Sequence, residues 1–384
     1  MKIYQYANKN HPYLETYDAG AMFIGSYVLK LFLQIAIVLL LALTDVPDSF
    51  TATIGGTCLI TSLNEIAFFL TPVAYGKIRG KNLLFDMGFE SRFSPLAALL
   101  CIPLTVAVIC LGSPLASGFI KLVELIGYDT SATSVVVDSG SDLAITLVFV
   151  ALIPAVAEEY LFRGNIARGL SKNGYFFAIF VSSALFAIMH GNPLQLVHQF
   201  FLGVVCAVLY FSTRSLWPSI IVHFLNNAIA LVLGYFESKG SPIVLSAWEA
   251  VLVCVAGLIA TVGLLWLIVF VCRRYKKTHP AKETLSEAAE TEYARKKYAV
   301  PAMQKTFFSL HRTDGEIAAD NMRAEEIKTL LDGAQTEAEK LVVTKDIKDR
   351  EGKARMKDKK ALIYSFIVTL AVWIISFISN VVQQ

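Results

Sequence analysis

The sequence predicts an all-α membrane protein: a polytopic transmembrane bundle of about eight core helices plus one C-terminal span, with a charged helical cytoplasmic insert. Apolar residues make up 55% of the 384 residues and charged residues only 17%, whereas a soluble domain has about 25% charged residues. Several apolar runs reach about 20 residues, the length of a helix that crosses the hydrocarbon core. The net charge of +3 is too small to indicate nucleic-acid binding.

Seven apolar runs have the length and composition of membrane spans. They are 21–43, 52–75, 94–120, 142–162, 216–236, 246–272 and 361–381. Two shorter runs, 175–190 and 194–212, lie between the fourth and fifth of these. A helix over 175–190 would be only about 24 Å long. It therefore extends beyond the core, tilts where the bilayer thins, or forms a re-entrant hairpin with 194–212, and the sequence leaves these alternatives open.

Basic loops alternate along the chain with loops that are poor in Lys and Arg. The loop after the first span contains no Lys or Arg, and the loop after the second contains Lys77, Arg79, Lys81 and Arg92. Because cytoplasmic loops carry the excess of Lys and Arg, the pattern predicts a multi-pass protein of the cell membrane with a cytoplasmic N-terminus. The predicted orientation is the same whether residues 175–212 cross the membrane twice or form a re-entrant hairpin.

These runs divide the chain into four regions. We expect an N-terminal cytoplasmic tail over 1–20, a transmembrane core over 21–272 and a C-terminal transmembrane helix over 361–384. Residues 273–360 are dense in Lys, Arg and Glu and poor in large apolar residues. This composition predicts a cytoplasmic insert that is helical or partly disordered. Its charges are expected to face water, with binding of its basic ends to anionic lipid headgroups as the alternative.

An ionisable residue inside an apolar helix needs a reason, because it costs about 2.5–3.5 kcal/mol at the centre of a membrane. Glu158 and Glu159 end the fourth run, and Arg163 follows them. Neighbouring helical positions are about 100° apart, so the two carboxylates face different partners. Glu159 and Arg163 have the i, i+4 spacing of an ion pair, which leaves Glu158 as a candidate general base. The alternative is a charge cluster at the cytoplasmic end of the helix.

Further polar residues lie in other apolar runs. His190 ends the short run 175–190, where a structural hydrogen bond is the alternative to a catalytic role. His223 and Asn227 have i, i+4 spacing, so both project from one helix face and could donate to a developing oxyanion. Their alternative role is a polar contact between packed helices. For Glu65, a single acid in the second span, we expect a structural hydrogen bond.

The acid, the two imidazoles and the amide together fit one reaction. Glu158, assisted by His190, would deprotonate a water, and His223 and Asn227 would hold the tetrahedral oxyanion. Counting spans, however, puts Glu158 near the cytoplasmic side and His190 near the opposite side. The two side chains meet only if the helix over 175–190 starts outside the hydrocarbon core or is re-entrant.

The order of these motifs resembles that of the CAAX protease and bacteriocin-processing family, the intramembrane glutamic proteases that include type II CAAX prenyl endopeptidases. The motifs are Glu-Glu-x-x-x-Arg, Phe-x-x-x-His and His-x-x-x-Asn on successive helices. The resemblance covers about residues 85–235 and leaves out the insert and the last span. It implies a protease-like core that cleaves peptides in a cavity within the membrane. At its centre it implies Glu158, His190, His223 and Asn227, with Glu159, Arg163 and Phe186 in supporting positions.

Three functions are compatible with these residues. The first is an endopeptidase that hydrolyses a peptide bond near the membrane, with a peptide or lipidated-peptide substrate and membrane lipids as its partners. The second is a non-catalytic peptide-binding or immunity protein of the same fold, and the third is a transporter with a proton relay. The His/Asn pair favours hydrolysis, because a relay needs no oxyanion clamp.

Motifs of other intramembrane proteases are missing. The sequence contains neither H-E-x-x-H nor Gly-x-Ser-x-Gly. No cofactor is expected, although two His and one Glu could hold zinc with an open position. The identity of the substrate, its prenylation, the role of the insert and the oligomeric state stay open at this point.

Overall fold

A computed structural model describes most of the membrane core. The described residues are 14, 16–44, 46–47, 50–51, 53–79, 83, 88–89, 93–130, 137–237, 239–240, 245–279, 362–364, 366–367, 369–371 and 374. The longer helices are α2 (Thr16–Ala42), α3 (Ile54–Ile78), α4 (Pro95–Glu124), α8 (Tyr175–Met189), α9 (Pro193–Thr213), α10 (Trp217–Glu237) and α11 (Ala247–Thr278). Between α4 and α8 the chain forms α5 (Gly140–Thr146), η2 (Leu147–Leu152), α6 (Ile153–Glu159), η3 (Tyr160–Ala167), α7 (Arg168–Leu170) and η4 (Ser171–Asn173).

Helices account for the whole architecture of the described residues, which contain no strand. Seven helices in this part of the chain are long and apolar enough to cross a membrane, and α8 is an eighth, shorter apolar helix. The all-α polytopic fold predicted from the sequence is therefore confirmed. The chain is a multi-pass membrane protein.

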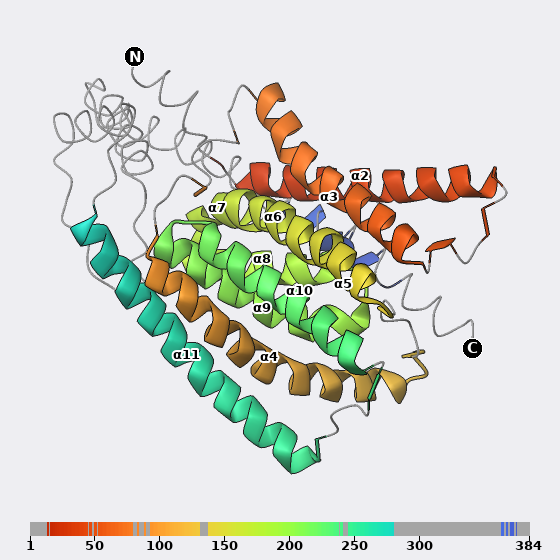
Figure 1. The fold of residues 1–384 in the computed structure, drawn as a ribbon. Helices are drawn as coiled ribbons and strands as arrows, with labels where there is room; N and C mark the ends of the chain where they lie inside the picture. Colours follow the sequence, from red (N-terminus) through yellow and green to blue (C-terminus); the bar gives the residue numbers. More distant parts are fainter. Residues whose placement is uncertain are drawn as a thin grey trace, which may run out of the picture.

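The helix that carries Glu158 lies in the middle of the bundle (Figure 1). The continuous segment from α5 to α7 runs between α2 and α3 on one side and α8, α9 and α10 on the other. α4 packs against α9 and α10, and α11 packs along α4 at the edge of the bundle. Residues far apart in the sequence therefore meet around α6.

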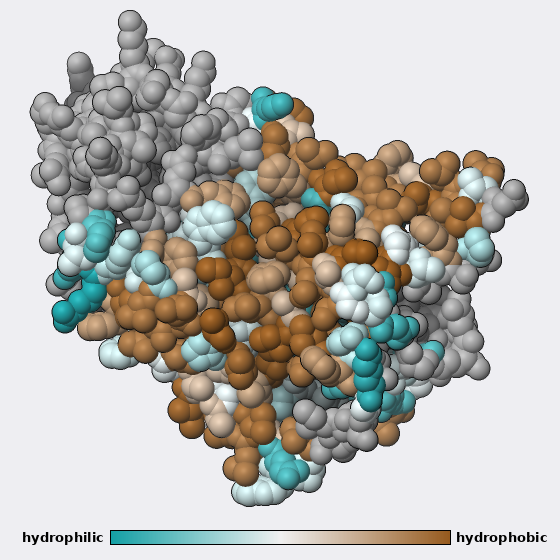
Figure 2. Space-filling model, viewed as in Figure 1, coloured by the Kyte–Doolittle hydropathy of each residue, from teal (hydrophilic) through white to brown (hydrophobic). Residues whose placement is uncertain are grey.

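The outer face of the bundle is apolar, as a surface in contact with lipid must be. Figure 2 shows mostly hydrophobic side chains over the helices on one face, with hydrophilic side chains near helix ends. Exposed large apolar residues include Phe32, Ile35 and Leu39 on α2 and Trp248, Ile259 and Trp266 on α11.

The fourth span is longer than the sequence predicts. It runs continuously from Gly140 to Leu170, so the expectation that Glu158 and Glu159 lie near a helix end is wrong. In the sequence, Arg163 looks like the polar residue that ends a membrane span. In the structure it is fully buried and hydrogen-bonded to other buried groups, so the helix continues past this position. On both sides of α6 the helix widens into the π-helical turns η2 and η3, which are frequent at functional sites.

The helix α8 is too short to cross the bilayer. Its 15 residues extend about 22 Å, against a hydrocarbon core of about 30 Å. It begins after Gly174, whose φ is +100°, and ends at His190, which precedes Gly191 at φ +69°. Asn192 then caps α9 by accepting a hydrogen bond from the Leu194 amide. Glu158 lies in mid-helix, and its Oε2 lies 3.9 Å from Nε2 of His190, so the two side chains that span counting separates do meet.

The helical core begins earlier and ends later in the chain than the sequence predicts. α2 begins at Thr16, inside the expected N-terminal tail, and α11 continues to Thr278, past the expected start of the insert at 273. Residues 281–360, where the charged insert is predicted, lie outside the described residues, as do most of 361–384. The described residues between 362 and 371 are helical, and Leu362 packs against the hydrophobic core.

Candidate active site

A cavity of about 550 Å³ opens next to Glu158. Its wall is formed by α2, α3, η2, α6, η3 and by the helices α8, α9 and α10. The polar residues of the wall are Lys30, Thr61, Asn64, Glu65, Glu158, His190, Gln195, His198, Gln199, Asn226 and Asn227. A polar cavity in an apolar bundle needs a function, because each buried polar group without a partner costs about 1–3 kcal/mol.

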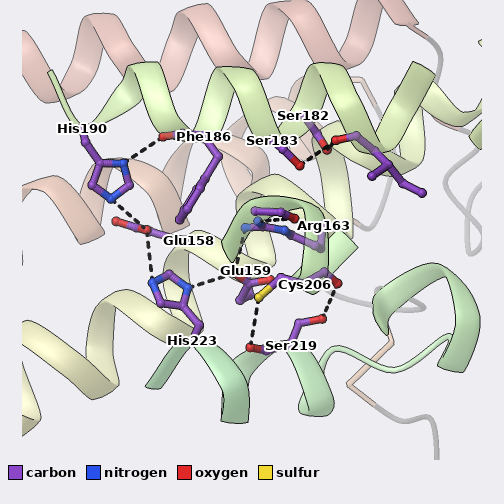
Figure 3. Close-up of polar contacts among 12 residues, drawn as sticks. Glu158, Glu159, Arg163, Ser182, Ser183, Phe186, His190, Cys206, Ser219 and His223 are labelled. Atoms are coloured by element: carbon purple, nitrogen blue, oxygen red, sulfur yellow. Dashed lines mark hydrogen bonds and ion pairs between the residues drawn. The ribbon is translucent and has the colours of Figure 1, made fainter. Parts of the chain in front are cut away.

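Glu158 faces two imidazoles at the edge of this cavity (Figure 3). Its Oε2 lies 3.9 Å from Nε2 of His190 and 3.7 Å from Nε2 of His223. These distances exceed those of direct hydrogen bonds, and Glu158 Oε2 is buried without a hydrogen-bond partner among the described residues. Three of the residues that the sequence singles out thus meet in space.

The end of α8 positions His190. Its Nδ1 lies 2.8 Å from the carbonyl oxygen of Phe186, one turn earlier. A carbonyl oxygen only accepts, so Nδ1 carries the hydrogen and Nε2 presents a lone pair towards Glu158. The Phe186 ring meets the His190 and His223 rings edge to face, at centroid distances of 4.9 and 5.6 Å. Phe186 therefore fixes the spacing of the two imidazoles.

A buried chain of polar contacts holds His223. Its Nδ1 donates to Oε1 of Glu159 at 2.9 Å, and the same oxygen accepts from Arg163 at 2.7 Å. Arg163 also donates to the carbonyl oxygen of Gly203 at 3.1 Å, and its guanidinium lies 4.5 Å from the centre of the Phe186 ring. Since Nδ1 carries the hydrogen, Nε2 of neutral His223 also presents a lone pair towards Glu158. The i, i+4 ion pair expected between Glu159 and Arg163 is present.

Asn227 takes part in a different set of contacts. Its Nδ2 donates to the carbonyl oxygen of Val150 at 3.5 Å, and its Oδ1 accepts from Asn226 at 3.2 Å. The Oδ1 of Asn226 lies 2.9 Å from Nε2 of His198. Asn227 lines the cavity, whereas the His223 side chain is only 1% exposed and lies outside the cavity wall. Of the two residues of the His-x-x-x-Asn motif, Asn227 therefore belongs to the cavity wall, whereas His223 belongs to the packed interior.

Four cavity residues escaped the sequence analysis or had another expected role. Lys30 was recognisable as the one basic residue in the apolar length of α2, and Asn226 stands next to a motif residue. His198 lies in the second short run, 194–212, and belongs to none of the three motifs, so the sequence did not single it out. Glu65, for which a structural hydrogen bond is expected, lines the cavity, and its Oε2 is buried without a hydrogen-bond partner among the described residues.

Zinc is the alternative that the two histidines and one glutamate left open. Three ligand atoms on a tetrahedral zinc ion at bonds of about 2.0–2.1 Å lie about 3.3 Å apart. The distances from Glu158 to the two imidazoles are wider, at 3.7 and 3.9 Å. Across the described residues, no group of three or more His, Cys, Asp or Glu side chains is arranged to hold a metal ion. The spacing suits a water molecule between these groups better.

Comparison with known proteins points to the same residues. Residues 140–229 match the family model of the type II CAAX prenyl endopeptidase Rce1-like proteins. This segment contains all three motifs and the side chains that meet around Glu158.

Two curated relatives are similar over part of this core. The putative membrane peptidase YdiL of Bacillus subtilis is 27% identical over 109 residues, 28% of this chain and 45% of that protein. The membrane-embedded CAAX protease MroQ of Staphylococcus aureus is 30% identical over 97 residues, 23% of this chain and 39% of that protein. The matches thus span less than half the length of either relative.

No solved structure matches this chain. The similarity to the type II CAAX prenyl endopeptidase Rce1-like proteins therefore covers residues 140–229, and the two relatives are similar to part of the chain. Within this segment the chain resembles CAAX proteases.

Proposed function

We propose that this protein is an intramembrane endopeptidase. Glu158 and His190 activate a water molecule for attack on a peptide bond near the membrane, and His223 and Asn227 hold the oxyanion. The observation that carries the proposal is the approach of Glu158 Oε2 to within 4 Å of two imidazole nitrogens, at the edge of the cavity. Support for peptide hydrolysis also comes from the two relatives, which are named as a membrane peptidase and a CAAX protease.

The hydrogen-bond directions favour a bound water at this point. With both Nδ1 atoms donating elsewhere, the two Nε2 atoms and the carboxylate are all acceptors. A water molecule can donate to two of them at once. As its oxygen attacks the substrate carbonyl carbon, one water proton passes to Glu158, with His190 as the second acceptor.

The oxyanion then needs donors that gain strength as charge develops. His223 becomes a donor at Nε2 when the water proton passes on to it from Glu158, whose Oε2 lies 3.7 Å away, and the Glu159 carboxylate beside its Nδ1 stabilises that imidazolium. Asn227 offers the second hydrogen of its amide group from the cavity wall. When the tetrahedral intermediate collapses, the C–N bond breaks and this same proton passes back through Glu158 to the leaving amine. The carboxylate is thereby restored.

The substrate is a peptide segment that enters the cavity, and lipidated peptides are candidate substrates. Amide, imidazole and hydroxyl groups in the wall can bind peptide groups through hydrogen bonds. The wall also contains apolar side chains, including Phe68 and Phe162. Prenylated and unmodified peptides therefore belong in the same assay.

The N-terminus is proposed to be cytoplasmic. The carboxylate of Asp18, at the start of α2, lies 3.8 Å from the guanidinium of Arg79, at the end of α3. The N-terminal side of α2 and the basic loop after α3 therefore share one face of the membrane, and the excess of Lys and Arg in that loop supports the cytoplasmic side. An N-terminal epitope tag should resist protease added outside intact cells, and its rapid removal would reverse the orientation.

The function is tested with the purified full-length protein in proteoliposomes. Wild type and Glu158→Gln are incubated with a peptide library in prenylated and unmodified forms, and products are identified by mass spectrometry. Because a general base contributes about 10²–10⁴-fold to rate, Glu158→Gln should lose at least about 100-fold in kcat.

Asp142→Asn is the matched control, since it neutralises a carboxylate at the start of the same helix, where the carboxylate accepts a hydrogen bond from Ser139. It should cleave like wild type. Cleavage by Glu158→Gln at the wild-type rate would overturn the proposal. Peptide binding without turnover by wild type would favour the non-catalytic alternative.

A further inference from the structure

Two buried charges face the cavity and have no part in the proposed reaction. Lys30 on α2 is 9% exposed, and Glu65 on α3 is 5% exposed. Both line the cavity together with Glu158. They come from helices outside the matched segment 140–229. Charges this deep in a membrane bundle are costly and usually serve a function.

Lys30 is bound to the end of the helix that presents His190. Its Nζ donates to the carbonyl oxygen of Met189 at 2.8 Å. Met189 is the last residue of α8, and His190 follows it directly. The last carbonyls of a helix have no partner within the helix, so the ammonium supplies one and ties α2 to this position. An ammonium has three donors, and two remain beyond this bond.

Lys30 faces the same cavity as Glu65 and Glu158. Each of these two carboxyl groups has a buried Oε2 without a hydrogen-bond partner among the described residues. Lys30 thus belongs to the cavity wall that contains the proposed general base, and it contacts the helix end that presents His190.

We propose that Lys30 is a positioning residue of the hydrolytic site. Through its hydrogen bond to the Met189 carbonyl, Lys30 fixes the end of α8 and thereby the place of His190 opposite Glu158. The inference rests on the proposed function and extends the site to α2.

This role predicts a loss of turnover without a loss of substrate binding. His190 assists Glu158 in the proposed reaction, so a misplaced end of α8 should lower kcat and leave KM nearly unchanged. A side chain that can still donate to the Met189 carbonyl should restore much of the lost rate.

The experiment uses the full-length protein in proteoliposomes and a peptide that wild type cleaves. Lys30→Met, Lys30→Gln and Lys30→Arg are compared with wild type in kcat and KM, and the folding of each variant is checked by thermal unfolding. Ser26→Ala is the matched control, because Ser26 is buried one turn earlier on α2 and bonds only within its own helix, to Met22. Lys30→Met should lower kcat on the order of 10-fold with little change in KM.

Lys30→Arg should keep most of the wild-type kcat, because arginine can donate to the Met189 carbonyl, and Ser26→Ala should leave kcat and KM unchanged. If Lys30→Met fails to fold, Lys30→Gln carries the test, since its shorter side chain should not replace the contact and should also lower kcat. Wild-type kcat in a folded Lys30→Met or Lys30→Gln variant would overturn the inference, and so would a Lys30→Arg variant that loses as much activity as Lys30→Met. If instead wild type cleaves nothing, or Glu158→Gln cleaves as well as wild type, the proposed function itself fails.

Discussion

Replacing Arg163 by Met should destabilise the bundle far more than removing a surface charge. Arg163 and Glu159 have side chains that are 0% exposed, and their ion pair is 2.7 Å long. Removing one member of such a pair leaves a buried charge without compensation, at a cost of about 3–5 kcal/mol. The variant also loses the hydrogen bond to Gly203 and the contact with the Phe186 ring. Arg163→Met should therefore lower the free energy of unfolding by at least about 3 kcal/mol.

The double variant Glu159→Gln/Arg163→Met separates stability from catalysis. It removes both charges, so most of the lost stability should return. Cleavage should stay reduced on the order of 100-fold or more, because a neutral amide in place of the Glu159 carboxylate cannot stabilise a protonated His223. The amide oxygen can still accept the hydrogen bond from Nδ1 of His223, so only the charge is missing.

The assay is equilibrium unfolding in mixed detergent micelles, followed by tryptophan fluorescence, with peptide cleavage measured on the same samples. Glu249→Gln is the control, since Glu249 is an exposed capping residue of α11 that bonds to Ser246. A loss below about 1 kcal/mol in Arg163→Met, the range of a surface ion pair, would refute the reasoning. So would a double variant no more stable than the single one.

Three further predictions concern packing, orientation and metal dependence. Gly203→Ala should destabilise by about 1–3 kcal/mol in the same unfolding assay, because its Cβ would lie 3.0 Å from Ser183 Cβ and 3.1 Å from Ser183 Cα; an unchanged midpoint would mean that α8 and α9 can separate there freely. Asn226→Ala should lower kcat about 10-fold without raising KM, because Asn226 orients the amide of Asn227; a change in KM alone would assign this residue to substrate binding. Dialysis against EDTA should leave cleavage at its original rate, and a loss that zinc restores would contradict hydrolysis by protein groups alone.

The apolar runs were enough to predict the fold. Every predicted core span corresponds to an observed helix, because about 20 apolar residues have few other solutions in a membrane. The end of the fourth span was predicted wrongly because of Arg163. Its burial depends on Glu159 in its own helix and on the Gly203 carbonyl, 40 residues further along the chain. The residues around Arg163 in the sequence do not reveal that its partner is the Gly203 carbonyl.

The candidate site was predictable as a set of residues but not as a geometry. The order of the motifs brought Glu158, His190 and His223 together as a hypothesis, and the fold places both imidazoles within 4 Å of the Glu158 carboxylate. The contact of Lys30 with the end of α8 could not be predicted, because it joins residues that are 159 positions apart in the sequence.

A single-turnover reaction in H₂¹⁸O tests the central claim most directly. Enzyme in excess over a cleavable peptide is quenched after one turnover, and the new C-terminal carboxylate is weighed by mass spectrometry. Attack by a water that Glu158 activates predicts one ¹⁸O atom in that carboxylate from the first turnover. An unlabelled product would mean that the oxygen came from a protein carboxylate, which would contradict direct attack by water at this site.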